Sequence, residues 1–517
     1  MTNTKSSYGK IQRMKSRKWM YVAPFAALAI TIQLSAQDSP PRHHQYKLAQ
    51  VGTFGGPDSG YVTGPGDSYE KYLNSQGATV GTAATNTTDP FPPNCFFDCF
   101  VDHALTFQNG TLIDLGALPG TVSSAAYGIN DNGLIVGVSE NGLIDPSTGY
   151  PEYHAVVWRH GVLSDLGTLG GTVSQAFMVN DQGQVVGVAA NAVPDPYASG
   201  LGSCTSWNCW TVTTQQRAFL WEGGALQDLG TLGGNDAVAY FVNAGGQVAG
   251  VSYTNTTPNS TTGLPTQEPF LWGHGSMVGL GSLGGTWGVA YSLNSRGQVA
   301  GNSNVAGDQF WHAFFWDRGV LTDLGTLGGD ISYGAWLNDA GNVVGGSLLA
   351  GDQDEHAFLW RHAAMTDLGT VSGDSLSVAF GINAGGQVVG CSGSSETGAC
   401  LHAFLWENGG PMVDLNALVE PPSNLQLLWG YAVADSGEIL AYGTLPNGDI
   451  RIAVLVPDGD CDSNCEARIA ASESNRATAA QSGQNSNALV SGKGAAWRLG
   501  PLGSRRFPPP QRALSPN

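Results

Sequence analysis

The stretch that decides the fold lies between Gly381 and Leu418, where GINAGGQVVG (381–390), HAFLW (402–406) and MVDLNAL (412–418) follow one another. The first segment has an asparagine followed three residues later by a glycine, which is typical of a tight turn between antiparallel strands. QVVG and HAFLW are short runs that are apolar on both faces, as strands covered on both sides must be. With MVDLNAL as a fourth strand, the segment predicts a small four-stranded antiparallel sheet.

Relatives of this unit recur along the chain, so the fold is predicted from internal repetition. The turn asparagine is kept in seven copies, at Asn74, Asn130, Asn180, Asn243, Asn294, Asn338 and Asn383. The eighth copy has Ala434 in its place. We expect an all-β chain that forms a β-propeller of eight four-stranded blades. Seven blades is the alternative, because the first copy departs most from the pattern.

The two ends of the repeat region complement each other. The last copy, which ends near Pro457, lacks a fourth strand, and Tyr46–Thr53 is a fourth-strand element without a repeat of its own. We therefore expect Tyr46–Thr53 to pair beside Ile452–Val456, complete the last blade and remove exposed sheet edges.

Composition excludes several classes of partner. The chain has 73 glycines, only 12% charged residues and a net charge of −19. Nucleic-acid affinity comes largely from Lys and Arg contacts to phosphates, and residues 46–457 have few of either. We expect no nucleic-acid partner and no anionic membrane surface as a partner.

The N-terminus resembles an export signal. A basic stretch is followed by an apolar run from Met20 to Leu34 and by small residues up to Ala36. That run is shorter than the roughly 20 residues of a membrane-spanning helix. We predict a signal peptide at 1–36, a linker at 37–45, the propeller at 46–457 and a tail at 458–517. The tail is expected to hold a small cysteine-containing turn and otherwise to be mostly disordered. The mature protein is expected outside the cell, with the periplasm as the alternative, and free of the membrane.

The eight cysteines fall into four local pairs, which predicts disulfides in an oxidising compartment. The pairs are Cys95 with Cys99, Cys204 with Cys209, Cys391 with Cys400, and Cys461 with Cys465. Zinc ligation by thiolates is the weaker interpretation, because the pairs lie in different repeats and lack the usual spacing.

Taken together, the HAFLW and DLGTLGG elements, with INxxGxVVG between them, resemble the extracellular HAF repeat family of exported bacterial proteins. The resemblance covers roughly residues 46–457. It implies secretion and a repeat architecture, and it carries no established activity.

No catalytic motif stands out, so we expect no enzymatic activity and no cofactor. The repeated histidines are expected to make structural hydrogen bonds rather than bind a metal, since propeller geometry would spread them around a ring. Asp458, Asp460 and Asp462 alternate as at the start of a calcium-binding loop. The closing glutamate of such a loop is absent, so they are weak candidates and we expect no metal site.

The repeats that differ from the common pattern suggest a binding surface. The loops between the second and third strands are long only in the first four repeats, and function in rigid β scaffolds usually lies on such loops. They carry aromatic candidates for ligand binding, namely Trp207, Trp210, Tyr197, Tyr150, Tyr153 and Phe96. We expect a monomeric binding or scaffold module for an extracellular glycan, cell-wall or protein ligand. A propeller-type lyase or glycosidase is the alternative.

Overall fold

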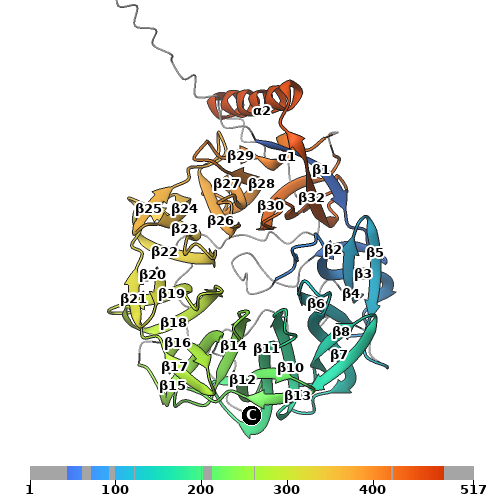
Figure 1. Cartoon of the computed structure of the whole chain (residues 1–517), viewed down its shortest axis with the longest axis vertical. Coiled ribbons are helices and arrows are strands. Elements are labelled where there is room, and N and C mark those ends of the chain that lie inside the picture. Colours follow the sequence, from blue (N-terminus) through green and yellow to red (C-terminus); the bar gives the residue numbers. More distant parts are fainter. Residues whose placement is uncertain are drawn as a thin grey trace, which may run out of the picture. The chain divides into compact units, whose positions relative to one another are not determined.

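The computed structural model describes residues 43–60, 71–91, 99–120, 123–198, 201, 212–260, 262–420 and 423–482. Within these ranges the strands form six four-stranded sheets and one eight-stranded sheet (Figure 1). The chain is therefore built from repeated four-stranded antiparallel sheets, consistent with propeller-like blades, as the sequence predicted.

The strands and helices follow one another along the chain in this order. They are β1 (His44–Gln50), β2 (Gly55–Gly60), β3 (Thr79–Thr88), β4 (Phe100–Gln108), β5 (Thr111–Gly116), β6 (Ser124–Ile129), β7 (Ile135–Ile144), β8 (Pro151–Arg159), β9 (Val162–Gly167), β10 (Gly170–Val179), β11 (Val185–Pro194), β12 (Thr214–Glu222), β13 (Ala225–Asp228), β14 (Ala237–Val242), β15 (Val248–Pro258), β16 (Pro265–Gly273), β17 (Ser276–Gly279), β18 (Gly284–Leu293), β19 (Val299–Val305), β20 (Trp311–Asp317), β21 (Val320–Asp323), β22 (Gly328–Leu337), β23 (Val343–Leu349), β24 (Glu355–Arg361), β25 (Ala364–Asp367), β26 (Leu376–Ile382), β27 (Val388–Ser394), β28 (Ala399–Trp406), β29 (Val413–Asp414), α1 (Leu415–Leu418), β30 (Gln426–Val433), β31 (Ile439–Thr444), β32 (Ile450–Asp460) and α2 (Ser463–Ser482).

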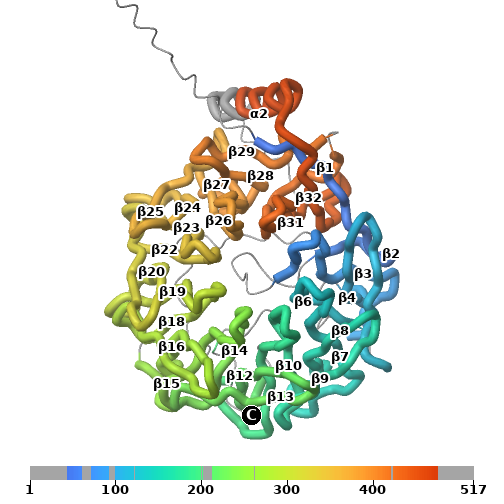
Figure 2. Tube along the Cα trace, viewed as in Figure 1, coloured from blue at the N-terminus to red at the C-terminus, as the bar shows by residue number. Residues whose placement is uncertain are grey.

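We number the four-stranded units by their strands. They are unit 1 (β2–β5), unit 2 (β6–β9), unit 3 (β10–β13), unit 4 (β14–β17), unit 5 (β18–β21), unit 6 (β22–β25), unit 7 (β26–β29) and unit 8 (β30–β32 with β1). Units 6 and 7 make up the eight-stranded sheet, and a single parallel pairing of Glu355 with Leu376 joins them. The trace in Figure 2 shows consecutive units lying side by side in chain order.

The N-terminal strand completes the last unit, as expected. β1 pairs antiparallel with β32, with Lys47 opposite Val456 and Ala49 opposite Val454. Tyr46 also bridges Val419 of the preceding segment. The same stretch of chain then contacts unit 8 again, because Val51 N donates to Ile452 O at 2.8 Å.

The turn asparagines link each unit to the next. In Asn180, for example, Oδ1 accepts hydrogen bonds from the main-chain N–H groups of Gln182 and Gln184, which closes the turn. Its Nδ2 donates to Asn243 O in unit 4 at 3.0 Å. The same inter-unit bond, 2.8–3.2 Å long, is made by Asn74, Asn130, Asn180, Asn243, Asn294, Asn338 and Asn383. We call these seven residues the asparagine belt, a role that goes beyond the turn role the sequence indicated.

The glycine that follows the paired valines lets the third strand pack. A Cβ on Gly390 would lie 2.0 Å from Val378 O and 2.7 Å from Phe404 Cε1. Phe404 is fully buried. The glycine is therefore needed because a neighbouring backbone and an aromatic ring occupy the space of a side chain.

The repeated histidines make the structural hydrogen bonds that the sequence suggested. In four units the histidine that begins the HAFLW-type segment contacts the aspartate of the fourth strand, Nδ1 to carboxylate oxygen, at 2.8–3.1 Å. Unit 3 replaces this contact with an Arg217–Asp228 ion pair. Partial burial works against ionisation of Asp165, but hydrogen bonds from His154 and Gly167 N–H outweigh it and lower the carboxyl pKa.

Two segments differ from the sequence prediction. The expected fourth strand of unit 7 is strand only at Val413–Asp414, and then turns into α1, whose first turn Asp414 caps by accepting from Asn416 N. In the tail, expected to be mostly disordered, Ser463–Ser482 forms helix α2. The segment is rich in alanine, and Asp462 Oδ1 accepts from Asn464 N and Cys465 N at its start. Neither helix of the described residues is long and apolar enough to cross a membrane.

Candidate functional site

The long hairpins lie where the sequence placed them. The second strands of units 1–4 are 10 or 11 residues long, whereas those of units 5–8 are 6 or 7. Because adjacent strands are antiparallel, these hairpins lie at the opposite strand ends from the asparagine belt. They form the predicted set of longer loops.

The predicted aromatic residues are distributed unevenly. Trp207, Trp210 and Phe96 lie outside the described residues. Tyr197 and Tyr150 are half-buried, whereas Tyr153 is only 6% exposed and belongs to the core. The expectation of an exposed ring is therefore not met at Tyr153, because the strand β8 turns its side chain toward neighbouring sheets.

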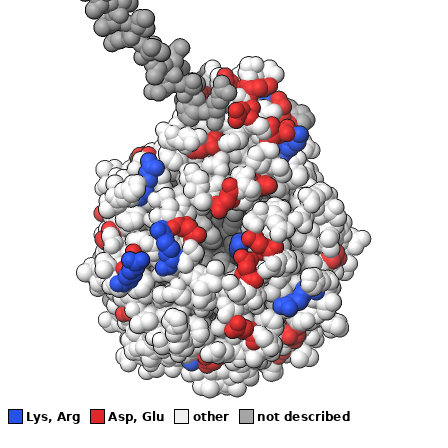
Figure 3. Space-filling model, in the orientation of Figure 1, with Lys and Arg blue, Asp and Glu red and all other residues white. Residues whose placement is uncertain are grey.

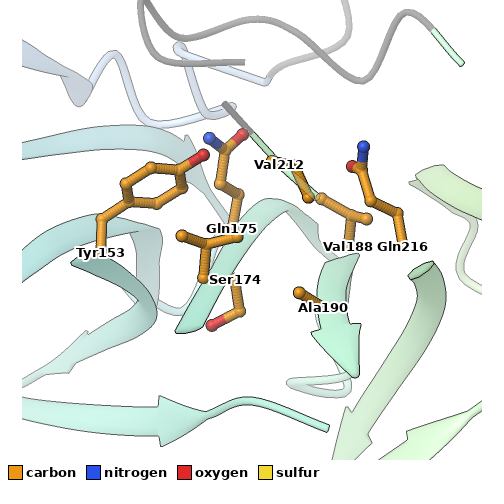
Figure 4. Close-up of a pocket in the computed structure, with 8 residues that line it drawn as sticks. Tyr153, Ser174, Gln175, Val188, Ala190, Val212 and Gln216 are labelled. Carbon is orange, nitrogen blue, oxygen red and sulfur yellow. The ribbon is translucent and has the colours of Figure 1, made fainter. Parts of the chain in front are cut away.

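Cavities beside these tyrosines are small. Tyr153 borders one with Gln175, Val188 and Gln216 (Figure 4), and its volume is about 10 Å³. Tyr150 borders another of the same size, beside Asp145 and Thr172. Each has room for about one water. Among the described residues, the long hairpins therefore offer no ligand-sized cavity at these two tyrosines.

A pair of buried carboxyls lies at the base of the unit 3 hairpin. Asp236 is fully buried, its Oδ1 accepts a hydrogen bond from Gln216 N at 2.7 Å, and its Oδ2 has no hydrogen-bond partner in the described structure. Burial above all, reinforced by the nearby Asp195, raises the pKa of Asp236 to about 7. Asp195 is itself 4% exposed and accepts from Tyr197 N at 2.6 Å. The carboxyls hold the hairpin against unit 4.

A ligand-sized hollow opens instead at the asparagine belt. Its volume is about 410 Å³, and residues of seven of the eight units line it. Cavities of roughly 300–1,000 Å³ are typical of small-molecule sites. In Figure 3 both acidic and basic side chains lie around this hollow, near the middle of the view. We call it the central hollow.

The charged side chains of the central hollow come from one repeat position. Asp131, Asp339 and Asp435 each directly follow the turn residue of their unit, and Lys71 is the one basic residue among the lining residues. Each aspartate Oδ1 accepts a main-chain N–H of the preceding unit, at 2.8–2.9 Å. Burial alone would raise the pKa of Asp131, but hydrogen bonds from Ser75 and the Lys71 charge lower it overall.

Aromatic rings make up much of the remaining lining. Tyr72 and Tyr431 meet edge to face with ring centroids 5.8 Å apart, and Phe380 lies 6.2 Å from Tyr431. Trp336 is more exposed than these three, which are 1–4% exposed, and its ring contacts Phe241 at 6.2 Å. The central hollow thus combines carboxylate side chains with aromatic residues, of which Trp336 is the most exposed.

Sequence reasoning missed this site, although a signal was present. The residue after the turn asparagine, or after Ala434 in the last copy, is aspartate in four units: Asp131, Asp181, Asp339 and Asp435. Only the arrangement of the units reveals that three of these carboxylates border one hollow.

The weak calcium candidates have other partners. Asp458 accepts from Lys47 Nζ at 2.7 Å, and Asp462 caps α2. No three His, Cys, Asp or Glu side chains of the described ranges gather as metal ligands would.

Two of the four predicted disulfides are seen, Cys391–Cys400 and Cys461–Cys465. Cys99 is also disulfide-bonded, whereas Cys95, Cys204 and Cys209 lie outside the described residues.

No protein-family model matches the chain, and no curated protein is significantly similar to it. The site must therefore be interpreted from its own chemistry.

Proposed function

We propose that the chain is a secreted, closed eight-bladed β-propeller that acts as a binding module, with its ligand in the central hollow. The observation that carries the proposal is a cavity of about 410 Å³ lined by seven units. Rigid strand ends from many units can hold such a site in place without a ligand.

Two further features support closure and secretion. β1 pairs with β32, and Ile450 N donates to Asp58 Oδ1 at 2.6 Å, so the first and last units are in direct contact. Local disulfides and the resemblance to exported HAF repeat proteins favour an extracellular location, with the periplasm as the alternative.

Binding is favoured over acid catalysis by the pKa of Asp131, which lines the central hollow. A general acid needs a raised pKa near the working pH, whereas the pKa of Asp131 is lowered. Asp236 has a raised pKa, but it is fully buried and does not line the central hollow.

The proposal can be tested with the secreted protein, residues 37–517, on arrays of glycans, cell-wall fragments and peptides. We expect specific binding that Trp336→Ala weakens at least about ten-fold, because Trp336 is the most exposed of the aromatic lining residues named above. The matched control is the double variant Trp207→Ala/Trp210→Ala on the long hairpins.

If the control loses binding and Trp336→Ala does not, the site lies on the long hairpins. Release of product from any bound polysaccharide would instead support the lyase or glycosidase alternative.

A further inference from the structure

We propose that the ligand of the central hollow is a small organic cation, with an ammonium group at the aspartates and its apolar part against the aromatic rings. This inference rests on the proposed function and specifies its ligand chemistry.

The carboxylates are fixed in place by the fold. Asp339 Oδ1 accepts from Ser295 N at 2.9 Å, and Asp435 Oδ1 accepts from Ala384 N at 2.8 Å. Each bond uses one oxygen, and no hydrogen bond to the second oxygen of either residue is seen among the described residues. A carboxylate held this way loses little side-chain entropy when it binds a cation.

The charge of the lining selects the sign of the ligand. Three aspartates and one lysine line the central hollow, so its formal charge is −3 + 1 = −2. An anionic ligand would be repelled, and a neutral ligand would displace water from these carboxylates without replacing its hydrogen bonds in full.

The aromatic lining suits the same class of ligand. Ammonium groups are attracted to the faces of tryptophan and tyrosine within about 6 Å of the ring centre. Trp336, the most exposed of these rings, comes from unit 6, the unit that also supplies Asp339. An aromatic ring and a carboxylate are therefore available on the same unit.

The sharpest probes are two sugars that differ in charge. We suggest titration of residues 37–517 with the β-1,4-linked glucosamine disaccharide and with its N-acetylated form, monitored by calorimetry at low and high salt. The first carries ammonium groups, and the second has the same ring system without them. A non-sugar cation, spermidine, tests whether charge alone is sufficient.

We expect the glucosamine disaccharide to bind roughly ten-fold or more tightly than the acetylated form, and to weaken with added salt. The double variant Asp339→Asn/Asp435→Asn should remove this preference. Asp181→Asn is the matched control, because Asp181 occupies the same repeat position and accepts from Asp131 N, yet it does not line the central hollow. Circular dichroism of each variant checks folding.

Equal or tighter binding of the acetylated sugar, unaffected by the double variant, would overturn the cation assignment and leave the proposed function standing. Failure of both amines to bind at millimolar concentration would also overturn it, and the array experiment with Trp336→Ala then decides the proposed function separately.

Discussion

At the scale of single residues, two buried aspartates at the bases of neighbouring hairpins have pKa values that are shifted in opposite directions. Burial works against ionisation of Asp145, but hydrogen bonds from Ser147 and Thr172 outweigh it and lower its pKa. Asp236 lacks such donors at Oδ2, so burial raises its pKa to about 7. Compared with an ordinary carboxyl group, the same residue type is therefore easier to ionise at one hairpin and harder to ionise at the other.

Asp236 should make stability fall as pH rises. A carboxyl with a raised folded pKa binds its proton more tightly in the folded state, so its contribution is complete below about pH 4 and is lost between roughly pH 4 and 7. Relative to Asp236→Asn, the free energy of unfolding of the parent should drop over this window by at most about 4 kcal/mol. Thermal unfolding at several pH values measures it.

The matched control is Asp145→Asn. Because the pKa of Asp145 is lowered, its contribution is present above the ordinary carboxyl range and is lost only in stronger acid. The difference between parent and this control should stay constant from about pH 5 to 8. A flat difference for Asp236→Asn as well would contradict the assignment.

At the scale of one element, the second strand depends on a glycine that local propensity disfavours. Glycine weakens a strand, yet any side chain at the position of Gly390 would clash with Val378 O and with the ring of Phe404. Packing between adjacent strands decides the residue at this position.

Gly390→Ala should destabilise the protein by roughly 3 kcal/mol, because relief of the clash requires a shift of backbone rather than of a side chain. Gly273→Ala is the control: its Cβ would meet only Gln247 Cγ at an ordinary 3.6 Å. Urea unfolding compares the two variants. Similar urea midpoints for the two variants would contradict this prediction, because they would show that the sheets separate easily at unit 7.

At the scale of the whole molecule, the contact between the last and first units uses different bonds from the other contacts. The asparagine belt makes seven links and ends at Ala434, which has no side-chain amide to donate. There the N-terminal segment makes the contact instead: β1 completes unit 8, and Ile450 N of unit 8 donates to Asp58 Oδ1 of unit 1 at 2.6 Å. The fold therefore depends on residues at its very start.

Residues 43–517 and residues 51–517 should behave differently. Loss of β1 exposes the edge of β32 and uncovers the apolar cluster around Leu455, so we expect a lower unfolding temperature and association between molecules. Light scattering and calorimetry measure both. A synthetic peptide of residues 43–50 should restore the longer form's behaviour, and unchanged stability of residues 51–517 would contradict the closing role of β1.

The sequence predicted most of the four-stranded units because each unit repeats its own short-range pattern. Asn383, Gly386 and the apolar runs after them define turns and strands within one copy. The pairing of β1 with β32 could also be predicted, since the last repeat lacked a fourth strand and the N-terminal strand belonged to no repeat. The sequence did not predict helix α2, because the tail is rich in Ala, Ser, Asn, Arg and Pro and has no apolar period.

The sequence by itself determined local features. These are the lengths of the strands, the positions of the turns, the pairing of neighbouring cysteines and the choice of the hairpins that are longer than the others. Only the tertiary structure decided which distant residues come together. Asp131, Asp339 and Asp435 are far apart along the chain, yet they border one hollow. The physical reason is that strand and turn preferences act over a few residues, whereas a cavity depends on how whole sheets pack against one another.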